Sequence, residues 1–388
     1  MVSASAVQLF CLHPHTGGTN TVFRSLHAAL ALLGDELLLF NEASHPTSAE
    51  RSEPVVARRC LERIAALKPA VVYLNILSSP FLTNLCRYIP ASIPVVALVH
   101  NITPGTYRHA LAYRPWLSHY VAVSPRIAAD LQRRDRRLGG RITVIPTGLP
   151  PAWFEAPPAA SLPPPRSFLF VGRFDAAAKG TAKLAEAFRR PALAGSQLTL
   201  VGDGPDRAAL ERSLADSPAA VRFLGSLDAT AVAAELRRHR HLLTPSNYEG
   251  QLLANLEAMA GGCVPITSAI QGVTDSYIQS GRNGFLVDPR GSRPLGRAIE
   301  QALTLSDEQW LQLSRQARAD ALAHHGLAPM ASAYAALRHS TLPVCSREAL
   351  DLDQHGWSYP PVIARSAGLR RLLPAPLKGW LRQQLAVR

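Results

Sequence analysis

The chain has 388 residues, of which 47% are hydrophobic and 18% are charged. This length is too great for one compact core and fits two domains of ~150 to 200 residues, with a cleft expected between them. The composition excludes a disordered chain. The formal charge of +13 suits an anionic partner such as nucleic acid, a phosphorylated lipid or a nucleotide diphosphate, and it can equally reflect coding bias.

Features that are missing from the sequence narrow the class further. The longest apolar stretch near the start, residues 26–40, is interrupted by Gly-Asp-Glu, and no other stretch approaches the ~20 uncharged residues of a membrane-spanning helix. Residues 1–15 lack the basic start and the cleavage site of a secretion signal, so we expect a cytoplasmic protein. The five cysteines contain no C-x-x-C pair and are expected to be reduced packing residues.

The first half of the chain alternates between strands and helices. A strand over 7–12 leads through a loop containing Gly17 and Gly18 into a helix over 20–33. Further strands are predicted at 36–40, 71–74, 95–99, 120–123 and 142–145, with helices such as 55–67 and 126–133 between several of them. This alternation predicts a parallel, doubly wound sheet.

A proline-rich segment, residues 157–166, separates this half from a second one. It holds five prolines in ten residues and is predicted to be a semi-rigid linker between an N-terminal domain, 1–156, and a C-terminal domain, 167–341. In the C-terminal domain the alternation restarts. Its strands are predicted at 168–171, 198–201, 221–224, 241–244, 264–267 and 284–287, and its helices at 181–189, 207–214, 230–238 and 252–260. Residues 342–388 form a basic tail.

Two glutamates stand at a spacing that suits a nucleotide sugar. Glu249 is predicted in the turn after a strand, and Glu257 two turns into the following helix. Eight residues of helix rise ~12 Å, comparable to the span from the sugar to the ribose of such a donor. The helix N-terminus between the glutamates favours a diphosphate. An ordinary helix with a solvent-facing glutamate is the alternative interpretation of this pair.

Two cations occur in an earlier loop of the same domain. Arg173 and Lys179 follow the strand over 168–171 and precede a helix. Fixed positive charges at that place stabilise the negative charge that develops on a departing nucleotide diphosphate. Taken alone, each cation is better interpreted as a solvated loop charge. Their joint value comes from lying at the C-terminal end of a strand, where open α/β sheets bind ligands.

Together these motifs resemble a known family. The chain is similar, from Val7 to about Pro289, to the retaining nucleotide-sugar glycosyltransferases of the GT-B fold (glycosyltransferase family 4), a group that includes glycogen synthases and many bacterial mannosyl- and glucosyltransferases. The resemblance implies an α/β protein whose two Rossmann-like, doubly wound parallel-sheet domains face a central cleft. The motifs that carry it are the first glycine loop, 98–101, 121–124, 145–148, the loop with both cations, 200–205, the segment with both glutamates, and 281–287.

The resemblance also implies roles for individual residues. Arg173 and Lys179 would bind the diphosphate, Glu249 the donor sugar and Glu257 the ribose, while His100 would lie near the acceptor and the anomeric carbon. His100, Arg173, Lys179 and Glu249 are thus the expected catalytic residues. A capped or packed histidine at a strand end is the alternative for His100. The other expected donor-binding residues are Gly17, Gly18, Gly202, Gly250, Gln251, Leu252 and Leu253. The family generally works without a metal, so neither a metal nor a cofactor is expected.

Departures from the family's pattern leave the donor open. The family has one residue fewer between the arginine and the lysine. It commonly has Phe-Gly where this chain has Gln251 and Leu252, and it commonly has other residues at Asn101 and Thr147. The base and the sugar of the donor are therefore not predicted.

The expected partners are a nucleotide-sugar donor and a glycan or lipid-linked acceptor, as in bacterial cell-surface polysaccharide synthesis. Residues 376–385 of the tail place apolar side chains at helical spacing beside Arg and Lys. They either lie on an anionic membrane, at the inner face of the cytoplasmic membrane, or pack back on the N-terminal domain. An epimerase of the same fold remains an alternative function. A nucleic-acid-binding protein is another, although no helix-turn-helix or zinc spacing supports it and no nucleic acid is expected.

Overall fold

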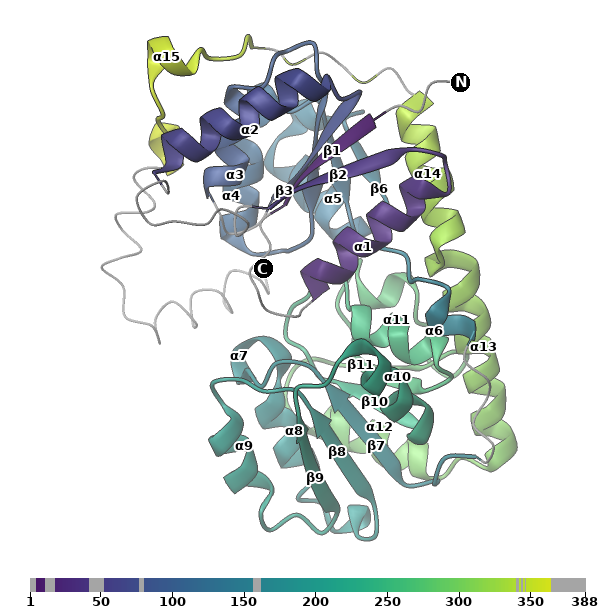
Figure 1. Cartoon of the computed structure of the whole chain (residues 1–388). Coiled ribbons are helices and arrows are strands. Elements are labelled where there is room, and N and C mark those ends of the chain that lie inside the picture. Colours follow the sequence, from purple (N-terminus) through teal and green to yellow (C-terminus); the bar gives the residue numbers. More distant parts are fainter. Residues whose placement is uncertain are drawn as a thin grey trace. The chain divides into compact units, whose positions relative to one another are not determined.

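The computed structural model describes residues 5–10, 18–41, 52–76, 80–155, 162–339, 342, 345 and 347–363. These residues form two compact units, which are described separately (Figure 1). The first unit contains the described residues up to Gly148 and from Leu327 onward, and the second contains Leu149–Gly326.

The first unit is built on a six-stranded parallel sheet in the order β2-β1-β3-β4-β5-β6. Its strands are β1 (Ser5–Phe10), β2 (Glu36–Asn41), β3 (Val71–Ile76), β4 (Val95–Val99), β5 (His119–Ala122) and β6 (Ile142–Val144). Its helices are α1 (Gly18–Ala31), α2 (Glu53–Leu67), α3 (Pro80–Asn84), α4 (Pro104–Ala112), α5 (Pro125–Arg134), α14 (Leu327–His339) and α15 (Leu352–His355). The central strand β4 is buried along its whole length, as a parallel strand covered on both faces must be.

Helix α14 belongs to this first unit although it follows the second unit in the chain. It lies beside α1 (Figure 1), and its apolar side chains share one core with that helix and the sheet. The ring of Tyr334 meets that of Tyr73 edge to face, with centroids 5.7 Å apart. The structural division at Gly326 therefore differs from the predicted end of the C-terminal domain at residue 341, because the apolar face of α14 is buried against α1 and the first sheet.

Part of the predicted tail also packs on the first unit. The indole of Trp357 stacks on Tyr88 with ring centroids 5.1 Å apart, and its Nε1 donates to a carboxylate oxygen of Glu53 at 2.9 Å. Arg58 of α2 pairs with Asp353 of α15. These contacts place the described part of the tail, up to residue 363, on the first unit. Residues 376–385, on which the membrane prediction depends, lie outside the described part of the chain.

The second unit has a six-stranded parallel sheet in the order β12-β11-β10-β7-β8-β9. Its strands are β7 (Ser167–Val171), β8 (Gln197–Val201), β9 (Ala220–Gly225), β10 (His241–Thr244), β11 (Val264–Ser268) and β12 (Phe285–Val287). Its helices are α6 (Ala152–Glu155), α7 (Ala176–Lys179), α8 (Thr181–Ala187), α9 (Arg207–Leu214), α10 (Ala229–Arg238), α11 (Leu253–Ala260), α12 (Arg293–Leu303) and α13 (Asp307–His325).

The boundary on the N-terminal side of this unit also differs from the prediction. The unit begins at Leu149, before the proline-rich segment, where the sequence indicated residue 156. Leu149 and Phe154 are buried in one cluster with Leu256 of α11 and Ala317 of α13, so the short helix α6 is part of the second core.

The predicted class of two parallel-sheet, Rossmann-like domains is confirmed, and each of the twelve predicted strands corresponds to a strand of the structure. The cleft between the domains stays a prediction. Within the described residues, no helix combines the length and the apolar character that crossing a bilayer requires.

Candidate active site

The strand order of the second unit defines where a ligand is expected. Its two halves start from the neighbouring strands β7 and β10, and the connections leave these strands in opposite directions along the sheet. Open α/β sheets bind ligands at such a switch point, outside the carboxyl ends of the strands. The loop after β7 carries Arg173 and Lys179, and the loop after β10 carries Glu249.

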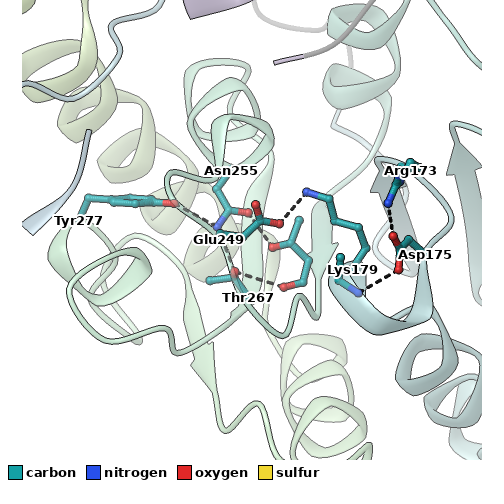
Figure 2. Close-up of polar contacts among 9 residues, drawn as sticks. Arg173, Asp175, Lys179, Glu249, Asn255, Thr267 and Tyr277 are labelled. Carbon is teal, nitrogen blue, oxygen red and sulfur yellow. Dashed lines mark hydrogen bonds and ion pairs between the residues drawn. The ribbon is translucent and has the colours of Figure 1, made fainter. Parts of the chain in front are cut away.

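The structure brings Lys179 and Glu249 together at this point (Figure 2). The ammonium of Lys179 donates to Oε1 of Glu249 at 2.6 Å, across seventy residues of sequence. The Glu249 side chain is 13% exposed and that of Lys179 is 32% exposed. The extra residue between the arginine and the lysine thus leaves Lys179 beside the glutamate.

The segment between Arg173 and Lys179 contains a one-turn helix, α7. Asp175 caps α7, because its carboxylate accepts from the backbone N–H of Ala178 at 3.0 Å. The helix ends at Lys179, and Gly180 follows with φ +67°, a left-handed conformation that glycine adopts without strain. A Cβ on Gly180 would lie 2.0 Å from the carbonyl oxygen of Pro245, so only glycine lets the two loops meet.

Arg173 is oriented differently from the other cation. Its guanidinium pairs with the carboxylate of Asp175, and its side chain is 62% exposed (Figure 2). No hydrogen bond joins it to Lys179 or Glu249 among the described residues. Asp175 was not among the predicted site residues. Aspartate is, however, one of the residues preferred at the N-cap position of a helix, so the sequence did carry a signal for its capping role.

Gly202 is one of the predicted donor-binding residues, and the structure gives it a clear packing role. It has φ +131°, and a Cβ there would lie 1.9 Å from the carbonyl oxygen of Gly172. Gly202 thereby allows the loops after β8 and β7 to touch. Its contact with a donor stays a prediction.

A buried polar cluster supports the segment that carries Glu249 (Figure 2). Asn255 of α11 accepts from Thr244 Oγ1 at 2.7 Å and donates to Thr267 Oγ1 at 3.0 Å and to the hydroxyl of Tyr277 at 3.4 Å. Burial raises the pKa of Tyr277, and the negative charge of Glu249 acts in the same direction. The cluster ties the ends of β10 and β11 to the helix that follows Glu249.

Two further polar residues at the site escaped the sequence prediction. Asn247 donates through its side-chain amide to the carbonyl oxygens of Ala176 and Ala177, at 3.2 and 3.0 Å. Lys183 of α8 donates to Asn247 Oδ1 at 2.8 Å. Both contacts span more than sixty residues of sequence, and no local pattern indicates them.

The helix after Glu249 starts later than predicted. Because α11 begins at Leu253, Glu257 lies about one turn into it, and the two glutamates are not separated by eight residues of continuous helix. Leu252, in the N-cap position, offers no side-chain cap. The N–H of Asn255 donates to the carbonyl oxygen of Leu252 at 3.1 Å, whereas those of Leu253 and Ala254 have no acceptor among the described residues and stay available to an anion. Gly250 and Leu252 are buried, whereas Gln251 and Leu253 are half-buried.

Glu257 has an environment unlike that of Glu249. Its side chain is half-buried and has no hydrogen-bond or ion-pair partner among the residues that the structure describes. Burial raises the pKa of its carboxyl group to about 7. A partner that offers hydroxyl groups would satisfy this carboxyl, and the predicted ribose contact is chemically consistent with that need.

Three of the predicted site residues, His100, Gly17 and Gly18, belong to the first unit. His100 directly follows β4, and its Nε2 lies 2.7 Å from Oδ1 of Asn75 at the end of β3. An amide oxygen only accepts, so Nε2 carries the proton. Nδ1 is buried without a hydrogen-bond partner among the described residues, and burial lowers the pKa of His100 to about 4, which keeps the ring neutral. Gly18 is the first residue of α1, and Gly17 lies outside the described residues.

Across the described ranges, no group of three or more His, Cys, Asp or Glu side chains is arranged to hold a metal ion. The prediction that the chemistry needs no metal stays a prediction.

Sequence comparison identifies the domain that carries this site. Residues 165–305 match the family model described as "Glycosyl transferases group 1". The glycogen synthases of two Mycobacterium tuberculosis strains, CDC 1551 / Oshkosh and ATCC 25618 / H37Rv, are each 30% identical over 232 residues, which is 54% of this chain. The chain spans about half the length of these curated relatives, since the match covers 55% of each.

Solved structures share the fold. A glycosyltransferase from Rickettsia africae ESF-5 superposes with a TM-score of 0.70 at 15% identity, covering 87% of this chain and 98% of that one. The sucrose-phosphate synthase of Thermosynechococcus elongatus gives 0.69 at 20% identity, covering 86% and 98%. Anabaena HepE in complex with UDP-glucose gives 0.67 at 15% identity, covering 86% and 98%. These matches confirm the predicted GT-B fold.

Proposed function

We propose that this protein is a retaining, metal-independent glycosyltransferase that moves a hexose from a nucleotide-diphosphate donor to a hydroxyl group of an acceptor. The observation that carries the proposal is the Lys179–Glu249 pair, which lies at the switch point of the second sheet next to the uncapped N-terminus of α11. A cation, a carboxylate and free backbone N–H groups are what a sugar diphosphate requires.

In this proposal, the two cations stabilise the leaving group. Lys179 and Arg173 offset the negative charge that builds up on the diphosphate as the glycosidic bond breaks, and the first-turn N–H groups of α11 add fixed dipoles. The solvent-exposed guanidinium of Arg173 is free to exchange Asp175 for a phosphate oxygen, since an exposed ion pair contributes little stability.

The carboxyl groups bind the rest of the donor. Glu249 accepts hydrogen bonds from sugar hydroxyls, and Glu257 binds the ribose. His100 lies near the acceptor, where its neutral ring offers Nδ1 as a hydrogen-bond acceptor. The acceptor hydroxyl attacks from the face that the diphosphate leaves, through an oxocarbenium-like transition state, so the anomeric configuration is retained.

The names of the relatives support nucleotide-sugar chemistry without fixing the substrates. One structural neighbour was solved with UDP-glucose. We propose an acceptor that is a glycan or a lipid-linked saccharide of cell-surface polysaccharide synthesis, used at the cytoplasmic face of the membrane. The basic tail would supply the peripheral membrane contact.

A panel of UDP- and GDP-sugars tests the proposal. Thermal shift identifies the donor, because a ligand that binds only the folded state raises the melting temperature. Product formation with an acceptor panel then tests transfer, and the anomeric proton coupling of the first product tests retention. Lys179→Met should abolish transfer, whereas the matched control Arg238→Met, at an exposed side chain of α10 that pairs with the largely buried Glu235, should not. Donor consumption without any acceptor would favour an epimerase, and an inverted product would refute the retaining mechanism.

A further inference from the structure

We infer that Lys183 is a positioning residue of the candidate active site, whose ammonium fastens the loop that carries Glu249 and supplies a positive charge beside the proposed diphosphate site. The inference deepens the proposed function and rests on it. Neither the resemblance nor the local sequence pattern indicates a role for this lysine.

The contacts of Lys183 join three segments of the second unit. Its Nζ donates to Oδ1 of Asn247, in the loop after β10, at 2.8 Å. It also donates to the carbonyl oxygen of Pro289, in the loop after β12, at 3.0 Å. Lys183 itself lies in the first turn of α8, four residues after Lys179. One ammonium thus connects the loops that follow β7, β10 and β12.

Asn247 connects Lys183 to the Lys179–Glu249 pair. Its backbone N–H donates to the carbonyl oxygen of Ala178 at 2.8 Å, and its side-chain amide donates to those of Ala176 and Ala177. These three carbonyls directly precede Lys179, and Asn247 precedes Glu249 by two residues. Lys183 binds the oxygen of the Asn247 amide, and the N–H groups of that amide are thereby directed toward the carbonyls of α7. The separation of Lys179 from Glu249 therefore depends on a contact that Lys183 orients.

The charge of Lys183 is not neutralised by an ion pair. Both of its acceptors are neutral, and its third N–H has no hydrogen-bond partner in the described chain. Asp288 is the acidic group that acts on it, but the Asp288 carboxylate is paired with Arg290 at 2.7 Å. The neighbouring Lys179 and Glu249 compensate each other. A half-buried ammonium without a counterion gains free energy from an anionic ligand nearby, so a diphosphate should favour its charged form.

Burial brings the pKa of Lys183 into a pH range in which binding can be measured. It lowers the pKa of Lys183 to about 8, although the charge of Asp288 acts in the opposite direction. Without ligand the lysine loses its proton as the pH rises through about 8, and a bound diphosphate shifts that loss to higher pH. Diphosphate affinity should therefore fall as the pH rises above about 8, and binding there should take up a proton.

The experiment compares the full chain with Lys183→Met and Lys183→Arg, with Arg238→Met as the control. Binding of UDP and of GDP is measured by calorimetry from pH 7 to pH 9.5, in buffers of different ionisation enthalpy. For the wild type we expect affinity to fall above about pH 8 together with proton uptake. Lys183→Met should bind about tenfold more weakly at pH 7, as expected for one lost charge-assisted contact, and should show no fall. Lys183→Arg should retain binding and lose the pH dependence, because arginine stays charged.

Each outcome decides the inference. Wild-type binding that Lys183→Met leaves unchanged, or a pH dependence that persists in Lys183→Arg, overturns the role of Lys183 alone. A wild type that binds no nucleotide diphosphate at any pH overturns the proposed function, and the inference falls with it. If Lys183→Met does not fold, as judged by circular dichroism, Lys183→Gln takes its place, because it keeps a hydrogen-bond donor and removes the charge.

Discussion

Comparing Gly180→Ala with Gly195→Ala distinguishes an effect on the close packing at the site from an effect on the stability of the fold. Gly180 has φ +67° and meets the Pro245 carbonyl, whereas Gly195 has φ +74° and nothing within 4 Å of its added Cβ. Both alanines pay the cost of a left-handed conformation, about 1 to 2 kcal/mol. That cost should lower the melting temperature by roughly 2 to 8 °C in a unit of this size.

Of the two substitutions, only Gly180→Ala also forces a backbone segment, the loop that contains Pro245, to move. The added Cβ would stand 2.0 Å from the Pro245 oxygen, so the loops must separate by about 1.4 Å to reach an ordinary contact. A displacement of about 1 Å in a positioning element costs up to about 100-fold in rate, and this one moves Lys179 relative to Glu249.

The assay is kcat/KM for the donor that the panel identifies, measured beside thermal unfolding for both variants. We expect roughly a 100-fold loss for Gly180→Ala and less than about threefold for Gly195→Ala. Equal kcat/KM values for the two variants would refute the reasoning, because the close contact would then have no bearing on catalysis.

Three further predictions concern ionisable groups. A double-mutant cycle with Lys179→Met and Glu249→Gln should give a coupling of about 1 to 2 kcal/mol in urea unfolding, since the pair is largely shielded, and a coupling near zero would contradict the pairing. Asn75→Asp should raise the pKa of His100 above its value of about 4, because a carboxylate at 2.7 Å favours the imidazolium; a histidine NMR titration that is unchanged would contradict this. Glu257→Gln should raise the melting temperature at pH 8 and leave it unchanged at pH 4. The folded state resists ionising this carboxyl up to about pH 7, so the wild type is penalised only where the unfolded chain is ionised. An equal effect at both pH values would count against the raised pKa.

Much of the fold could be predicted because buried parallel strands are short apolar runs, and such runs stand out among the helices and loops. The domain boundaries could not. An apolar face shows that α14 must be buried, but it does not show whether Met330 and Tyr334 pack on the preceding unit or return to the first one. The predicted boundary was placed at the proline-rich segment. In the structure the second unit begins before that segment, because Phe154 is buried with α11 and α13.

The candidate site likewise has features that the sequence predicts and features that it does not. Lys179 and Glu249 were predictable because each lies in the segment that follows a strand of the switch point, and such segments meet at the same edge of the sheet. The start of α11 was not, since Leu252 occupies the N-cap position without a capping side chain and the sequence carries no start signal there. Lys183 could not be found either, because its acceptor in Pro289 is a backbone carbonyl 106 residues away, which no side-chain pattern marks.

The two glutamates of one segment differ because their surroundings differ, and that difference suits a divided role. Glu249 accepts a hydrogen bond from the ammonium of Lys179 at 2.6 Å. In the proposed function, it releases Lys179 to a phosphate and turns to the sugar hydroxyls. Glu257 has no ion-pair partner in the described part of the chain, and burial raises its pKa to about 7. A carboxyl group that is partly protonated at neutral pH both donates and accepts, and a vicinal diol such as that of ribose presents both kinds of partner. Close to an already dianionic diphosphate, a second full negative charge would repel the ligand, so a carboxyl that gains its proton easily binds the ribose at lower electrostatic cost than an ionised one.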